Sequence, residues 1–334
     1  MEPRLQNQIL QNTGKWLVDP GTGSRVLALT IAPVIIFLIF TAGCVQQQEN
    51  AGISDNSTSR LTVAVTILPQ KQFVERIAGE HVDVIVLVPP GASPHTYEPT
   101  PKQMEEISKA SVYFKVGSGV EFERAWMDKL RGVNPGMTIV DSSEGIRPIT
   151  GVPDDEDGGA AQDTHPIESA EETSTDPHIW LSPKNARIMV ENTYRGLAQA
   201  DPSHIAEYRT NADAYITELD VVDVEITEEL SQNKIRTFMV YHPAWSYFAR
   251  DYGLIQIPIE TDGKDTSPAG IENLILQAKE GNITVIFASP EYSTKSASMI
   301  AHEIGGSVAR VSPLEEDYLG NMRNVLQAFT RSQM

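Results

Sequence analysis

The chain has 334 residues, of which 40% are hydrophobic, and this is enough for two domains of ordinary size with packed cores. Its 45 acidic residues against 26 basic ones give a formal net charge of −19, which argues against a nucleic-acid partner. The single cysteine, Cys44, excludes an internal disulfide and a thiolate-cluster metal site, so burial alone must stabilise the fold.

The first 43 residues are typical of a secretory signal peptide. A basic flank precedes an apolar run at 26–40, and small residues follow at 41–44 (TAGC). The run is short for a membrane-spanning helix, although an uncleaved membrane anchor is the alternative interpretation. The end of the signal resembles a bacterial or archaeal lipobox, with Thr41 in place of the usual aliphatic residue. This resemblance implies a mature chain that begins at a lipidated Cys44. Residues 51–60 are polar and lack aromatic side chains, which predicts that 44–60 is a flexible tether.

Eight short β-branched segments alternate with helical patterns in the rest of the chain. The predicted strands are 61–67, 82–88, 112–116, 138–140, 237–241, 256–259, 285–288 and 308–311. Strands that alternate with helices indicate an α/β fold with parallel sheets. Four strands on each side of a long helical stretch predict two similar lobes, at 61–200 and 233–334.

The stretch at 201–232 is predicted to be one long helix that joins the two lobes. Asp201 is expected to cap it and Pro202 to occupy its first position. Apolar or aromatic residues then recur at steps of three and four, which predicts one buried face: Ile205, Tyr208, Ala212, Tyr215, Leu219, Val222 and Ile226. About 29 helical residues span roughly 43 Å, enough to run along both lobes.

An acidic segment at 152–176 interrupts the first lobe. It carries repeated Asp and Glu among Gly, Ala, Ser and Thr, with one histidine, His165. Such a composition cannot bury enough apolar surface to order itself, which predicts a mobile loop. It is either a solvated insertion or a weak collector of cations near the site.

Three of the seven histidines stand out because each lies in a turn that contains proline. His95 follows the strand at 82–88, His178 precedes a helix capped by Ser182, and His242 follows the strand at 237–241, with Pro243 expected to start a helix. We assign the other histidines to surface or loop roles: His81, His165, His204 and His302.

These three turns suit a metal site. In open α/β sheets, ligands bind at the carboxyl ends of the strands. Imidazole suits zinc, copper and nickel, and zinc favours four ligands in a tetrahedron. Helix N-termini repel a cation, so a nearby carboxylate is expected to complete the shell. Glu291, which follows the strand at 285–288, is the first candidate, and Glu260 and Asp262 are the alternatives.

The same segments resemble the zinc- and manganese-binding solute-binding proteins of ABC transporters. The resemblance covers about 61–329, and the segments that carry it are 88–99 (VPPGASPHTYEP), 176–181 (DPHIWL), 241–248 (YHPAWSYF), 252–254 (YGL), 260–264 (ETDGK) and 313–318 (PLEEDY). It implies two lobes joined by a rigid helix, with the metal in the cleft between them.

The resemblance also implies the ligands. The first two family ligands match His95 and His178. The third is histidine in zinc-type members and commonly glutamate in manganese-type members, so His242 indicates zinc, with manganese less favoured. The usual positions of the fourth ligand match Ser289 and Ser293, and Glu291 lies between them; either Glu291 or water completes the shell.

The function implied is high-affinity capture of Zn²⁺ and its delivery to the membrane permease of an ABC importer. The protein would be a monomeric lipoprotein on the outer face of the cytoplasmic membrane, and not an enzyme. Two alternatives remain open. A zinc hydrolase would use a three-histidine zinc ion to activate water, but the chain has no HExxH motif. A surface adhesion protein is the other, although the sequence offers no additional domain for it.

Overall fold

The computed structural model describes residues 60–150, 175–260, 264 and 266–331. The predicted signal peptide, Cys44, most of the acidic segment and Asp262 therefore lie outside the described residues. In the described part of the chain, none of the helices has the length and apolarity that crossing a membrane requires.

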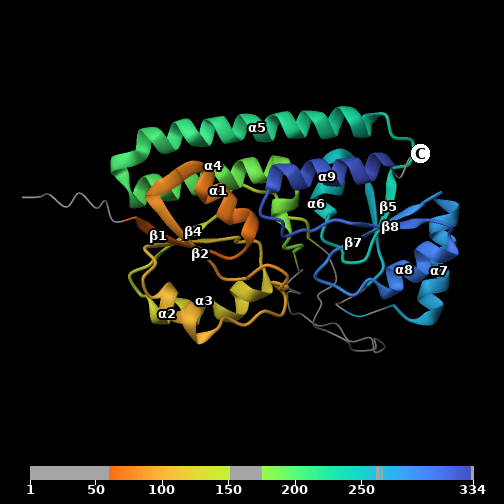
Figure 1. Ribbon diagram of the computed structural model, residues 1–334, viewed down its shortest axis with the longest axis horizontal. Coiled ribbons are helices and arrows are strands. Elements are labelled where there is room, and N and C mark those ends of the chain that lie inside the picture. The colour runs from red at the N-terminus through yellow and green to blue at the C-terminus, as the bar shows by residue number, and fades with distance from the viewer. Residues whose placement is uncertain (1–59, 151–174, 261–263, 265, 332–334) are drawn as a thin grey trace, which may run out of the picture. The chain divides into compact units, whose positions relative to one another are not determined.

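The first lobe is a four-stranded parallel sheet with the strand order β2-β1-β3-β4. Its strands are β1 (Leu61–Val65), β2 (Val82–Val86), β3 (Val112–Lys115) and β4 (Thr138–Asp141). Its helices are α1 (Leu68–Ala78), α2 (Pro101–Ile107), α3 (Glu121–Val133) and α4 (Pro183–Ala200). Figure 1 shows α1 and α4 on one face of the sheet and α2 and α3 on the other.

The second lobe repeats this arrangement with the strand order β6-β5-β7-β8, also parallel. Its strands are β5 (Thr237–Val240), β6 (Ile255–Pro258), β7 (Val285–Ala288) and β8 (Ser307–Arg310). Its helices are α6 (Ser246–Tyr252), α7 (Pro268–Glu280), α8 (Lys295–Glu303) and α9 (Tyr318–Arg331). The predicted α/β fold, the eight strands and the two similar lobes are confirmed.

Polar side chains cap the helices that follow two of the three histidine turns. Thr100 Oγ1 accepts a hydrogen bond from the Gln103 amide at 3.3 Å and begins α2. Ser182 Oγ accepts a hydrogen bond from the Asn185 amide at 3.4 Å and begins α4.

The prediction that Pro243 starts a helix is wrong. The Ala244 amide bonds back to the carbonyl of His242 at 2.8 Å, and this turn delays α6 to Ser246.

The long helix is α5 (Ile205–Ser231), and its buried residues repeat the predicted spacing. They are Tyr208, Ala212, Tyr215, Leu219, Val222, Ile226 and Leu230. The predictions that Asp201 caps this helix, that Pro202 occupies its first position and that Ile205 is buried are wrong. Pro202–His204 forms a separate 3₁₀ turn, so α5 begins at Ile205, whose side chain is 47% exposed. The Asp201 carboxylate accepts from the Tyr208 hydroxyl at 2.8 Å and does not cap α5.

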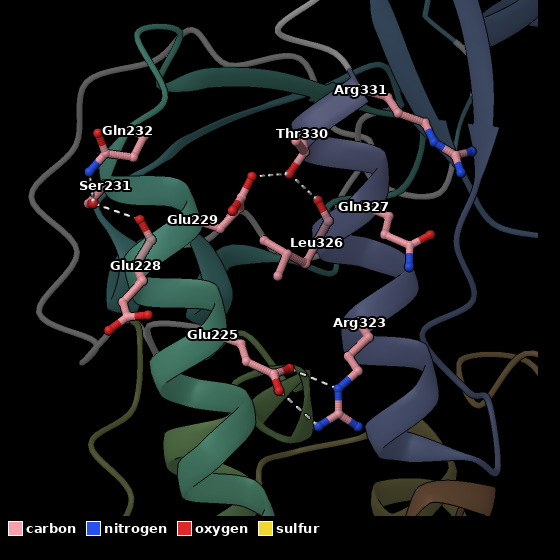
Figure 2. Close-up of a pocket in the computed structure, with 10 residues that line it drawn as sticks. All are labelled: Glu225, Glu228, Glu229, Ser231, Gln232, Arg323, Leu326, Gln327, Thr330 and Arg331. Atoms are coloured by element: carbon pink, nitrogen blue, oxygen red, sulfur yellow. Dashed lines mark hydrogen bonds and ion pairs between the residues drawn. The ribbon is translucent and has the colours of Figure 1, made fainter. Parts of the chain in front are cut away.

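Helix α5 packs against elements of both lobes (Figure 1). On the first lobe, the Tyr215 hydroxyl donates to Gln72 of α1 at 2.9 Å. On the second, Arg323 of α9 donates to both carboxylate oxygens of Glu225 at 2.8 and 3.2 Å. Figure 2 shows this pair at one end of a groove between α5 and α9, about 930 Å³ in volume. One continuous apolar core contains residues of both sheets and of α5.

Candidate metal centre

The structure brings the three predicted histidines together from three different connecting segments, two of which follow strands. His95 lies in the turn between β2 and α2, His178 precedes a 3₁₀ turn before α4, and His242 follows β5. Nε2 of His178 lies 3.2 Å from Nε2 of His95 and 3.1 Å from Nε2 of His242. Among the described residues, these three form one group whose candidate ligand atoms all lie within 4.8 Å of one another.

Each of the three imidazoles has a carboxylate oxygen against its Nδ1 atom. The distances are 2.7 Å from His95 to Glu121, 2.9 Å from His178 to Asp176, and 2.5 Å from His242 to Glu260. A carboxylate that accepts from Nδ1–H fixes the tautomer and leaves the Nε2 lone pair for a metal ion. All three Nε2 atoms are therefore set to act as ligands at one point.

Asp176 was expected in the mobile acidic loop, and that prediction is wrong. Asp176 is 2% exposed, and its Oδ1 accepts from the His178 amide at 2.8 Å as well as from the ring. Its own amide donates to the Ile149 carbonyl at 3.0 Å, and its carbonyl accepts from Tyr247 at 2.9 Å. The Asp-x-His spacing was a usable signal, because an aspartate often bonds the backbone two residues later.

Glu121 and Glu260 complete the set of carboxylates. Sequence reasoning missed Glu121, which opens α3 and has no local relation to His95. Glu260 was an alternative candidate for a metal ligand; the structure places it, 3% exposed, on the Nδ1 side of His242. Its Oε1 thus contacts the ring nitrogen of His242 that is not part of the Nε2 cluster, and Glu260 lies outside the group formed by the three histidines.

Burial and neighbouring groups shift the pKa values of His242 and Glu121. Burial lowers the pKa of His242 well below its usual value, and the nearby His178 and His95 lower it further. Burial pushes the pKa of Glu121 upward, but the hydrogen bond and charge of His95 outweigh this and leave that pKa lowered. At neutral pH the His242 lone pair is thus available to a cation.

The three rings line a cavity of about 10 Å³, room for one water-sized sphere. Residues of both lobes enclose it: Ser93, Pro94, His95, His178, Trp180, His242, Glu291, Tyr292, Pro313 and Leu314. A cavity of this size suits a single ion and excludes an organic ligand.

Glu291 lines the same cavity but lies outside the group formed by the three histidines. Its Oε1 accepts from the Ser312 hydroxyl at 3.1 Å, while its Oε2 is buried without a hydrogen bond from any described residue. Burial raises the pKa of Glu291. Ser289, at one of the usual positions of the fourth ligand, is buried in a separate small cavity beside His242.

Tyr292 covers the cavity from the second lobe. Its ring stacks on His242 with the centroids 4.6 Å apart, and its hydroxyl lies 3.4 Å from Ser93 Oγ of the first lobe.

The other described histidines lie away from this cavity. His81 and His204 stack on each other, and His302 is exposed on α8.

The chain is similar to metal-binding proteins of zinc-uptake systems. The family model of the zinc-uptake complex component A, periplasmic, matches residues 63–332. The high-affinity zinc uptake system protein ZnuA of Bacillus subtilis is 30% identical over 281 residues, which cover 83% of this chain and 85% of that protein. A crystal structure of ZnuA aligns with a TM-score of 0.75 at 38% identity, covering 82% of this chain and all of that one.

Two further relatives differ in length or in name. The zinc-binding protein AdcA of Streptococcus pyogenes is 30% identical over 286 residues, and the chain spans 55% of its length. A mutant of the laminin-binding adhesin Lmb of Streptococcus agalactiae aligns with a TM-score of 0.69 at 25% identity, covering 82% of this chain.

Proposed function

The chain belongs to the family of the zinc-uptake complex component A, and we propose that it captures Zn²⁺ outside the cytoplasm for delivery to an ABC-type metal importer. His95, His178 and His242 bind the ion between the lobes at 61–200 and 233–334, which the helical stretch at 201–232 joins. The observation that carries the proposal is the convergence of three Nε2 atoms, each on a ring oriented by a carboxylate.

The spacing of the imidazoles fits zinc. Three nitrogens at the usual Zn–N distance in a tetrahedron lie about 3.3 Å from one another. The Nε2 of His178 lies 3.2 and 3.1 Å from the other two Nε2 atoms, close to this value. Three imidazoles also favour zinc over manganese, which prefers carboxylate and water oxygens.

The fourth ligand is Glu291 or a water molecule. Glu291 lines the cavity and has a buried oxygen without a hydrogen bond from the described residues, so a small shift of its turn would give the ion a negatively charged ligand. Comparing the zinc affinity of Glu291→Gln with that of the unchanged chain separates the two cases. A loss of affinity assigns Glu291, and an unchanged affinity assigns water.

The test of the metal site is titration of the purified chain with Zn²⁺ in competition with a chromogenic chelator. His95→Ala and His242→Ala should each abolish tight binding, while His302→Ala, an exposed histidine on α8, should leave it unchanged. Zinc affinity that survives both site substitutions would overturn the assignment. Elemental analysis of protein purified under metal limitation identifies the bound metal.

Delivery and location need separate tests. Cys44 is proposed as the lipidated residue, so Cys44→Ser should release the protein from the membrane fraction without changing its zinc affinity. Deleting the protein should impair growth at low zinc, and added zinc should restore it. Growth that does not depend on zinc would contradict a role in uptake.

A surface adhesin is the second candidate, because one structural neighbour at 25% identity is a laminin-binding adhesin. If adhesion is the main role, the purified chain will bind laminin whether or not His178 is replaced by alanine. Zinc-dependent growth without laminin binding would favour the transport function.

A further inference from the structure

One buried carboxylate outside the histidine cluster connects α3 to the sheet of the first lobe. Glu123, in the first turn of α3, is 6% exposed. Its Oε1 accepts from the Val116 amide at 2.6 Å and from the Thr66 hydroxyl, and its Oε2 accepts from the Gly117 amide at 3.0 Å. Thr66 directly follows β1, and Val116 and Gly117 directly follow β3, so this one side chain joins α3 to the carboxyl ends of two neighbouring strands.

Such a group is costly to bury. Burial raises the pKa of Glu123, and its three hydrogen bonds oppose the rise by favouring the charged form. A buried carboxylate is tolerated when its hydrogen bonds are satisfied, and removing them leaves a large penalty. The contacts of Glu123 therefore define where the first turn of α3 lies.

The same turn of α3 touches the His95 turn in two places. Glu121 Oε2 lies 2.7 Å from His95 Nδ1, and the Phe122 amide donates to the Pro94 carbonyl at 3.0 Å. Three consecutive residues thus have three different partners: the His95 ring, the backbone before it, and the ends of β1 and β3. The first turn of α3 therefore contacts the turn that carries His95, and the hydrogen bonds of Glu123 fix that first turn of α3 against the sheet.

We propose that Glu123 is a positioning residue for metal binding, which acts through the first turn of α3 to keep Glu121 against His95. This inference rests on the proposed zinc site. It assigns Glu123 no contact with the ion.

The lobe offers a matched control in Gln70. Gln70 is 2% exposed, accepts from the Thr66 amide at 3.1 Å, and donates to the Phe114 carbonyl at 3.1 Å. It therefore connects the ends of the same two strands, but its hydrogen bonds go to residues outside α3. Gln70→Leu should lower the stability of the lobe, because it removes buried hydrogen bonds and leaves their partners unsatisfied, but it should leave the His95 turn in place.

The experiment is a double-mutant cycle on the full chain, with zinc affinity measured by chelator competition. Glu123→Gln should weaken zinc binding about tenfold, the lower end for residues that orient metal ligands. In a Glu121→Gln background, Glu123→Gln should add less than about a twofold loss, because the contact it maintains is already gone. Gln70→Leu should change the affinity less than about twofold in either background.

A metal-free measurement separates this inference from the zinc assignment. Nitrogen NMR of the His95 ring should show the Nδ1–H tautomer in the unchanged chain and a mixture in Glu123→Gln. If the unchanged chain binds no zinc, the proposed function fails while the tautomer result still decides the role of Glu123. Should Glu123→Gln not fold, Thr66→Val removes one of the same hydrogen bonds, and it should shift affinity and tautomer in the same direction by less. Unchanged affinity and tautomer, or losses that add fully with Glu121→Gln, would overturn the proposal.

Discussion

The Nδ1 atom of His242 lies 2.5 Å from Oε1 of Glu260, the shortest of the three imidazole–carboxylate contacts at the cavity. Both side chains are buried, at 7% and 3% exposure. Glu260 follows β6 and His242 follows β5, so the contact also joins the ends of two neighbouring strands. The orientation of this ligand is therefore set by the sheet of the second lobe.

Glu260→Gln should weaken zinc binding by about 10- to 100-fold, because a neutral amide no longer raises the basicity of His242 or fixes its tautomer. Chelator competition at neutral pH measures the loss. Glu229→Gln, an exposed residue of α5, is the control and should leave the affinity unchanged. An affinity equal to that of the unchanged chain would show that Glu260 does not act on the metal ligand.

Tyr292→Phe should make bound zinc dissociate about 2- to 10-fold faster, because it removes the hydroxyl that faces Ser93 Oγ at 3.4 Å across the cavity. Stopped-flow mixing of the zinc-loaded protein with excess chelator gives the rate. Tyr97→Phe is the matched control, since the Tyr97 hydroxyl bonds Gln103 at 2.8 Å and does not line the cavity. Equal effects of the two substitutions would argue against a closing role for Tyr292.

Ile226→Ala should lower the free energy of unfolding by about 2–5 kcal/mol, because Ile226 is fully buried in the core between α5 and both lobes. Val224→Ala, two residues earlier on the same helix and 52% exposed, should change it by less than about 0.5 kcal/mol. Urea unfolding of the metal-free chain measures both values. Similar losses for the two variants would mean that α5 does not bury the face described above.

Asp201→Asn should destabilise the chain at neutral pH but not in strong acid. Burial raises the pKa of Asp201, but hydrogen bonds from Ser203, His204 and Tyr208 outweigh this and lower it to about 2 from 3.8. A lowered carboxyl pKa contributes stability above pH 3.8, and that stability is lost as the pH falls toward 2. Because Asp201 is partly exposed, solvent screening limits the expected difference to about 1 kcal/mol.

The measurement is urea unfolding of both proteins at neutral pH and at successively lower pH. The two unfolding free energies should converge below pH 3.8. Asp128→Asn, an exposed residue of α3, should show neither the loss nor the convergence. A difference between the Asp201→Asn and unchanged chains that stays constant with pH would assign the loss to packing and not to charge.

Much of the fold could be predicted from the sequence because its signals are local. Segments rich in β-branched residues, such as 61–67 (LTVAVTI), predict the strands, and the three- and four-residue spacing of Tyr208, Ala212 and Tyr215 predicts the buried face of α5. The cap at Ser182 was equally readable. The start of α5 was not readable in this way. A separate 3₁₀ turn at Pro202–His204 precedes the helix, and Ile205, the first residue of α5, is exposed, which the spacing of apolar residues does not indicate.

The three histidines could be singled out by their turns, but their carboxylate partners could not. Glu121 lies 26 positions after His95 in the chain, and only the packing of α3 brings the two within 2.7 Å. Glu260 is a carboxylate that follows a predicted strand, and the sequence alone does not separate a metal ligand from a group that orients one. Pairings of this kind depend on tertiary contacts.

Under the proposed function, the continuous apolar core has a consequence for how an importer would recognise the zinc-loaded protein. The core passes from β1 through α5 to Phe238 and Phe329 of the second lobe, so pulling the lobes apart would expose large aromatic surfaces to water at about 1.5–3 kcal/mol for each side chain. We expect the ion to leave through small displacements of the turns at 93–95 and 289–292. A permease would then sense occupancy at the rim of the cavity, through shifts of a few side chains, with the two halves keeping one mutual orientation throughout the cycle.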